Sequence, residues 1–213
     1  MNKVKQAKKE FAKLNRGETK LFRRLKSPQK IQDFINSLPI NFEKSGETCF
    51  SPRLVLRKKR AHCLEGAIFA AAVLWFNGQK PLILDLKAAN SDDNHVVAVF
   101  KRGAYFGAIS KTNHAVLRYR EPIYKSVREL AMSYFHEYFL DSGKKTLRSY
   151  SALLDLGRFP NAEWITSEKN LWFIDNALEK TRHYPILNTR QIKSLRLADK
   201  LEIKAGKMRQ WPK

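Results

Sequence analysis

The sequence predicts an α+β fold in which a cysteine-bearing helix packs on a small antiparallel sheet. Three observations support it. Residues 62–76 are apolar and rich in alanine, as in a buried helix. Residues 81–86 and 95–109 have the composition of strands, and Lys101-Arg102-Gly103-Ala104 interrupts the second run as a hairpin turn would. A chain of 213 residues is long enough to bury one sizeable core.

Charge divides the chain into three parts. The net charge is +21, of which residues 1–60 carry +12, residues 61–175 carry +2 and residues 176–213 carry +7. This distribution predicts a basic, partly disordered arm over 1–26, a single domain over 27–188 and a basic helical tail over 189–213. Basic ends favour contact with an anionic partner.

Helix-capping residues, turn residues and apolar spacing predict the elements around this core. Ser27-Pro28 begins a helix that Pro39 ends, and residues 40–60 read as irregular. Apolar spacing predicts a long helix over 127–139, closed by Ser142-Gly143. The Leu-rich stretch 145–158 is compatible with a further helix, residues 189–204 with a short basic helix, and residues 205–213 with a loose tail.

The most informative pair of residues is Cys63 and His95. Cys63 stands at the start of the predicted helix, where the partial positive charge of the helix terminus lowers a thiol pKa. His95 opens the strand-like run that follows about thirty residues later. A thiol at a helix start that faces an imidazole on a strand is the arrangement of Cys–His nucleophilic catalysis.

The surrounding pattern resembles the transglutaminase-like branch of the papain-like cysteine enzymes, over about residues 50–125. Small and apolar residues follow the cysteine at helical spacing, and then come Asn77-Gly78 and a strand. The resemblance implies a papain/transglutaminase-like core in which the nucleophilic cysteine heads a helix, a histidine opens a strand and an aspartate lies near the end of the next strand. The aromatic expected four residues before that aspartate is matched by Phe106.

Ser110 occupies the position where the family has its aspartate. If the turn centres on Arg102-Gly103, Ser110 lies opposite His95 across the hairpin. A serine hydroxyl accepts a hydrogen bond from an imidazole N–H, but it does not stabilise an imidazolium by charge as a carboxylate does. Asn113, three residues further on, is a second candidate for orienting His95.

Other polar residues near these positions have two readings each. His62 adjoins Cys63 and is expected to point away from it, because neighbours on a helix do not face each other. His114 is the alternative imidazole if the hairpin register differs. Asp92 and Asp93 are either an acidic partner of the imidazole or solvated loop residues, and the loop reading is favoured.

Three further features complete the candidate list. Glu65 fits the first turn of the helix, where the dipole favours an acid. The run Arg57 to Arg60 is either a solvated turn or a positive rim that lowers the Cys63 pKa. Cys49 reads as an incidental loop thiol, and the spacing of the two cysteines indicates no metal site.

The resemblance implies a cysteine enzyme that hydrolyses or transfers an amide of a peptide or protein through Cys63, His95 and Ser110, without a cofactor. The alternative is a catalytically weak member of the same fold that serves as a basic binding module for nucleic acid or another polyanion. No run approaches the roughly 18 apolar residues of a membrane span, no apolar leader is visible at the start, and two cysteines make no disulfide framework, so a cytoplasmic location is expected.

Overall fold

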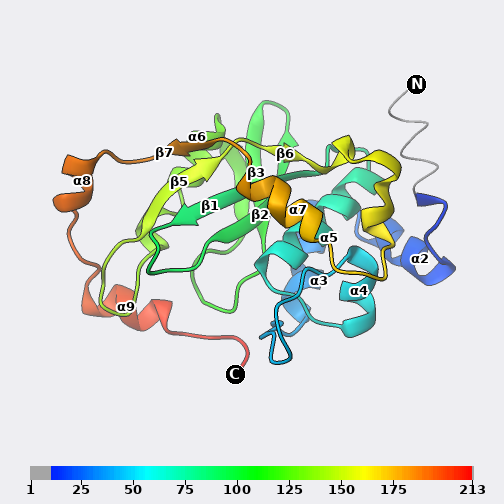
Figure 1. Cartoon of the computed structure of the whole chain (residues 1–213), viewed down its shortest axis with the longest axis horizontal. Helices are drawn as coiled ribbons and strands as arrows, with labels where there is room; N and C mark the ends of the chain where they lie inside the picture. Colours follow the sequence, from blue (N-terminus) through cyan, green and yellow to red (C-terminus); the bar gives the residue numbers. More distant parts are fainter. Residues whose placement is uncertain (1–10, 213) are drawn as a thin grey trace.

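The computed structural model describes residues 11–212 as a mixed α+β fold built on one antiparallel sheet (Figure 1). The strand order is β4-β3-β2-β1-β5-β7, and β6 pairs with β1 beyond the end of β5. The strands are β1 (Leu82–Ala88), β2 (His95–Arg102), β3 (Tyr105–Ser110), β4 (Arg120–Tyr124), β5 (Leu147–Ser151), β6 (Leu154–Asp155) and β7 (His183–Pro185). The predicted class is therefore confirmed as α+β, with a larger sheet than the sequence indicated.

Helices cover both ends and both faces of this sheet. The α-helices are α2 (Arg16–Arg24), α3 (Pro28–Ser37), α4 (Pro52–Lys58), α5 (Cys63–Phe76), α6 (Val127–Met132), α7 (Trp172–Glu179), α8 (Thr189–Lys193) and α9 (Lys200–Gly206). Short 3₁₀ turns lie at Phe135–Glu137 (η1), Leu156–Arg158 (η2) and Pro160–Ile165 (η3). No helix in the described part of the chain is long and apolar enough to cross a membrane.

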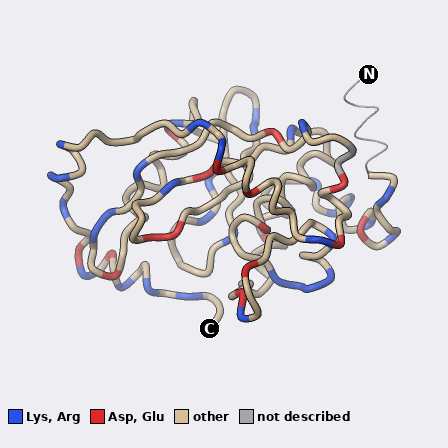
Figure 2. Tube along the Cα trace, viewed as in Figure 1, with Lys and Arg blue, Asp and Glu red and all other residues tan. Residues whose placement is uncertain are grey.

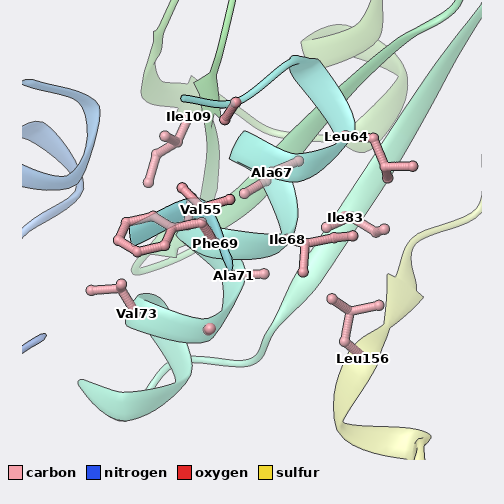
Figure 3. Packing of buried hydrophobic residues seen from close by; sticks show 14 of the residues in the cluster. Val55, Leu64, Ala67, Ile68, Phe69, Ala71, Val73, Ile83, Ile109 and Leu156 are labelled. Carbon is pink, nitrogen blue, oxygen red and sulfur yellow. The ribbon is translucent and has the colours of Figure 1, made fainter. Parts of the chain in front are cut away.

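Helix α5 is the central packing element. Its alanine-rich sequence lets neighbouring helices and strands approach closely, and its residues from Leu64 to Leu74 are buried on every side of the helix. Figure 3 shows Ile68 of α5 facing Ile83 of β1 and Leu156, while Val55 of α4 packs on the other side. The helix ends at Phe76, and Gly78 follows with a positive φ of 90°, which suits a glycine after a helix.

The sheet is apolar on both faces, which explains the continuous hydrophobic runs of its inner strands. Alternate residues Ile83, Val96 and Ala98 face the core that α5 fills. Leu84, Val97 and their neighbours face a second core that contains residues of α6. Because successive strand residues point to opposite faces, strands buried on both sides carry no polar alternation.

The basic N-terminal segment joins the main core. Asn15 and Glu18 form a reciprocal cap at the start of α2, and Phe22 and Leu25 are buried. Phe22 packs edge-on against Phe69 of α5, with ring centroids 5.8 Å apart. Residues on the N-terminal side of the boundary that charge predicted at residue 26 therefore pack into the same core as the domain. The expected disorder of residues 1–10 lies outside the described residues.

Three predicted elements differ in the structure. The long helix over 127–139 divides into α6 and η1, and the buried hydroxyls of Tyr134 and Tyr138 donate hydrogen bonds to the carbonyls of Arg118 and Asp93. Residues 145–158 form β5 and β6, which pair with the free edge of β1. The irregular stretch 40–60 contains α4, capped by Ser51.

The basic tail forms two helices instead of one. Residues 194–199 separate α8 from α9, and within them the Ala198 amide donates to the Gly143 carbonyl at 2.8 Å. Lys and Arg are spread along the chain from α2 to the C-terminal segment, with acidic residues interspersed (Figure 2).

Candidate active site

Cys63 is the first residue of α5 and lies at a cleft of about 820 Å³. The cleft walls come from three loops that meet at the end of the sheet where α5 begins. They are residues 92–95 before and at the start of β2, residues 111–117 after β3, and residues 137–142 after η1. Cys63 as a residue is partly exposed, and it is one of the residues that line this cleft.

Two imidazoles flank the Cys63 thiol. Burial by itself raises the pKa of this thiol, but hydrogen bonding and charge from His62 and His95 outweigh it and hold the pKa well below its ordinary value. A thiol with a lowered pKa exists as the nucleophilic thiolate near neutral pH. The structure therefore brings Cys63 and His95 together, as the sequence predicted.

The expectation that His62 points away from Cys63 is wrong. His62 is the N-cap of α5, with extended backbone angles of φ −93° and ψ −172°, so the rule for neighbours inside a helix does not apply to it. Its imidazole Nε2 lies 3.0 Å from the carbonyl oxygen of Thr48 and 3.4 Å from Glu65 Oε1. Hydrogen bonding to Cys63 and nearby carboxylate charge overcome desolvation and raise the pKa of His62 to about 9.

Glu65 is more than a residue compatible with the helix dipole. Its carboxylate is fully buried. It accepts hydrogen bonds from the amides of His62 and Phe50, from the Thr48 hydroxyl at 2.7 Å and from the Asn41 side chain. These donors fix the carboxylate in place beside His62, and its charge contributes to the raised pKa of that imidazole.

His95 is oriented by a short chain of hydrogen bonds. Its Nε2 lies 2.8 Å from Ser110 Oγ, and Ser110 Oγ donates to the Leu117 carbonyl at 2.5 Å. Because the serine proton is committed to that carbonyl, Ser110 accepts from His95, and Nε2 must carry a proton. The neutral His95 ring then keeps its lone pair on Nδ1, which fixes the tautomer.

The predicted pairing of Ser110 with His95 is correct for the side chains but wrong in register. Ser110 lies directly opposite Val97, because the turn centres on Gly103 and Ala104, one residue later than expected. Gly103 adopts a φ of 59°, which suits a tight hairpin turn. His95 and Ser110 are therefore diagonal neighbours, a distance that long side chains still span.

The Leu117 carbonyl accepts the last hydrogen bond of this series, and Leu117 has an unusual backbone conformation. Its φ is 60°, in the left-handed region that non-glycine residues seldom adopt. Its amide donates to Glu137 Oε2 at 2.8 Å, and Arg120 pairs with the same oxygen at 2.6 Å. The surrounding contacts thus hold Leu117 in the conformation that turns its carbonyl toward Ser110.

Gln32 of α3 fixes the backbone on which Ser110 stands. Its amide nitrogen donates to the Ser110 carbonyl at 2.8 Å, and its amide oxygen accepts from the Ser110 N–H at 2.9 Å. All of these groups are buried. Gln32 therefore pairs with the end of β3 as a neighbouring strand would.

Replacing Gln32 with Ala is expected to destabilise the protein by about 2–4 kcal/mol, because two buried backbone groups lose their partners. Gln29→Ala, on the same helix, is the matched control, since Gln29 makes no comparable contact with β3 and should change stability by less than about 0.5 kcal/mol. Urea unfolding followed by circular dichroism measures both values. Equal stability of the two variants would show that the pairing contributes nothing.

No family model matches this chain, and no curated protein matches it.

Asn113 does not orient His95. Its side chain forms a pair of hydrogen bonds with the backbone of Trp211, at 2.9 Å to the carbonyl and 2.8 Å from the amide. The neighbouring His114 is also committed elsewhere, with Nδ1 2.8 Å from the Gly206 carbonyl. Asn113, the alternative orienter, and His114, the alternative imidazole, thus hold the C-terminal segment 206–211. This segment is docked along the cleft rim and is not the loose tail that the sequence predicted.

Asn113→Ala is expected to release this segment without changing the rest of the fold. The two hydrogen bonds to Trp211 would be lost, and the bond after Arg209 should become at least about tenfold more sensitive to trypsin, because proteolysis requires local opening. Mass spectrometry of timed digests measures the rate. The bond after Arg182, far along the chain, serves as the internal reference, and an equal change at both sites would indicate general destabilisation instead.

The remaining candidates have structural roles. Asp92 accepts from the Thr146 hydroxyl and from the Asp93 amide, which agrees with the loop reading, although both aspartates line the cleft. Cys49 is fully buried, and burial raises its pKa to about 12. The run Arg57 to Arg60 is exposed, and Arg57 forms an ion pair with Glu168 at 2.6 Å.

A second buried pair lies within electrostatic reach of Cys63. Asp85 of β1 pairs with His183 of β7 at 2.9 Å, while its Oδ1 has no hydrogen-bond partner. Burial raises the pKa of Asp85, and the charge of Cys63 adds to this despite the neighbouring His183. No local sequence signal marks this pair, since its members are 98 residues apart. Within residues 11–212, no group of three or more His, Cys, Asp or Glu is placed to hold a metal ion.

Proposed function

We propose that this protein is a transglutaminase-like cysteine enzyme that cleaves or transfers an amide acyl group through Cys63. The observation that carries the proposal is a thiol at a helix start, in the lining of a cleft, that interacts with two imidazoles, one of which is oriented by Ser110. The thiolate would attack the carbonyl carbon, the C–N bond would break, and the leaving amine would take a proton from an imidazolium. Water or an amine would then release the acyl group from sulfur.

The order of elements supports the same family. A cysteine helix, one strand, a histidine-bearing strand and a return strand that ends at the orienting residue follow one another as α5, β1, β2 and β3. The departure at the third position is chemically workable, because Ser110 is turned into an acceptor by the Leu117 carbonyl. A peptide or protein amide is the substrate class that this chemistry favours.

An acyl burst tests the proposal without knowledge of the natural substrate. Mixing the protein with p-nitrophenyl acetate should release one nitrophenolate per molecule, as the Cys63 sulfur forms a thioester and the ester C–O bond breaks. Intact-mass spectrometry after acid quenching should show one added acetyl group. Cys63→Ala should show neither, whereas Cys49→Ala should keep both; a burst that survives in Cys63→Ala would refute the proposal.

Ser110→Ala is expected to slow this acylation by about 10- to 100-fold, because His95 loses the group that fixes its tautomer. Ser110→Thr keeps the hydroxyl and should retain most of the rate. Ser110→Asp should not restore activity, since a carboxylate placed against the Leu117 carbonyl brings two acceptors together in a buried position. Stopped-flow absorbance of nitrophenolate compares the variants, and an unchanged rate in Ser110→Ala would remove Ser110 from the site.

A second function, binding of a polyanion, is favoured by the net charge of +21 and by the exposed run Arg57 to Arg60. Binding of this kind would rest on phosphate contacts and counterion release. The affinity for a fluorescent oligonucleotide should then fall steeply between 50 and 200 mM salt, on the order of 10³-fold for six or more contacts. Anisotropy that is flat with salt would exclude this function.

A further inference from the structure

We propose that His62, and not His95, is the imidazole that takes the proton of Cys63 in the resting protein, and that His95 serves the incoming acyl acceptor. This inference rests on the proposed role of Cys63 as the nucleophile. It assigns to the two histidines different tasks, which the arrangement of their partners makes distinct.

The contacts of His62 determine which nitrogen can take the proton. The Thr48 carbonyl, 3.0 Å from Nε2, can only accept a hydrogen bond, so Nε2 carries a hydrogen in the neutral ring. The lone pair is therefore on Nδ1. Transfer breaks the S–H bond of Cys63 and forms an N–H bond at Nδ1, which leaves a thiolate beside an imidazolium and no change in total charge.

Negative charge surrounds His62 and stabilises this imidazolium. Glu65 Oε1 lies 3.4 Å from Nε2 on the same helix, and Glu43 Oε1 lies 3.6 Å away on the loop before Cys49. Asp175 of α7 also interacts electrostatically with His62. The ring is mostly buried, so these charges act with little screening.

His95 has no comparable support. The hydrogen-bond partner of its Nε2 is the neutral hydroxyl of Ser110, which orients the ring but does not balance a positive charge. The thiolate also interacts with Asp85 of β1, whose charge would oppose it, and pairing of Asp85 with His183 offsets this. The proton of Cys63 is thus better held at His62 than at His95.

This division gives each histidine one step. In acylation the His62 imidazolium would protonate the leaving amine. In release, Nδ1 of neutral His95 would take a proton from water or an incoming amine as the C–S bond breaks. That proton would then return through the sulfur to His62 and restore the resting ion pair. It also accounts for a serine in place of the family's aspartate, since His95 need not hold a lasting positive charge.

The pH profile of Cys63 alkylation by iodoacetamide distinguishes the two histidines without any substrate. The wild-type rate should rise once well below the ordinary thiol pKa of about 8.5, and again near pH 9, where His62 loses its proton and the thiolate is no longer paired. His62→Gln should abolish the second rise and slow alkylation at pH 6 by about tenfold or more, because the first rise moves upward by at least one pH unit. His95→Gln, the matched variant, should keep both rises.

The opposite pattern, with both rises kept in His62→Gln and lost in His95→Gln, would overturn the inference while leaving Cys63 as the nucleophile. Failure of the proposed function would give a different result: in the wild type and in both histidine variants, Cys63 would react no faster than it does in urea. The inference would then fail as well. Should His62→Gln not fold, Cys63→Ala replaces it: imidazole NMR titration should show the His62 pKa falling from about 9 by one unit or more. An unchanged His62 titration in Cys63→Ala would equally overturn the inference.

Discussion

Iodoacetamide added to the folded protein at pH 7 is expected to modify Cys63 and leave Cys49 intact. Burial raises the pKa of Cys49 to about 12, so roughly one thiol in 10⁵ would be ionised at pH 7 even before access is considered. His62 and His95 keep the pKa of Cys63 well below its usual value, and its thiolate opens to the cleft. Peptide mass spectrometry of timed samples should give a rate ratio above about 10³.

The same reaction in 8 M urea is the control, because both cysteines should then alkylate at similar rates. Equal rates in the folded protein would contradict the difference in environment between the two thiols. Protection of Cys63 alone by an added acyl substrate would, in turn, link its reactivity to the cleft.

Replacing Gly66 with Ala is expected to damage the fold and the site together. A Cβ at this position would lie 2.5 Å from Cβ of Lys111, a separation that atoms in proteins do not tolerate. Helix α5 and the end of β3 would have to move apart, at a cost of about 1–3 kcal/mol. The shift acts one turn from Cys63 and one residue from Ser110, so acylation should fall by about 10²-fold as the reacting groups separate.

Gly17→Ala in α2 is the matched control. The nearest atom to its added Cβ is the Asn15 side-chain oxygen at 3.3 Å, and alanine is favoured in helices, so stability should change little. The double variant Gly66→Ala with Lys111→Gly removes the clashing Cβ and should recover part of the acylation rate. Normal stability and rate in Gly66→Ala would show that the close approach has no role.

Local chemistry explains which parts of the fold could be predicted. The Cys63 helix, the strand after it and the hairpin follow from their apolar composition and from a glycine turn, all of which act over a few residues. The helix at Pro52–Lys58 carries the same Ser-Pro start as Pro28–Ser37 and could have been found by that signal. The stretch 145–158 could not, because its leucines become strands only where β1 offers an open edge.

The residues of the candidate site likewise fall into those that local sequence patterns predict and those that they do not. Cys63, His95 and Ser110 lie on neighbouring elements, so their proximity follows from helix and hairpin geometry. The contribution of His62 does not follow from the rule for neighbours inside a helix, because His62 is the N-cap of α5. Histidine is not one of the residues, such as Ser or Asp, that mark an N-cap in a sequence. Gln32 and Leu117 have no local signal, since one acts across 78 residues and the other through a backbone conformation.

The docked C-terminal segment also gives the protein an intrinsic optical probe. Trp211 lines a hollow of about 470 Å³ together with Ile40 and Phe42, and these two residues also line the cleft of Cys63. Its indole N–H is buried without a hydrogen-bond acceptor, so the ring is sensitive to any acceptor group or water that enters. Among the four tryptophans, Trp75 and Trp164 stack on each other within the core, 6.0 Å apart, and serve as an internal reference. Occupancy of the cleft can therefore be followed by the emission wavelength of Trp211 in the unlabelled protein, with Trp211→Phe as the blank.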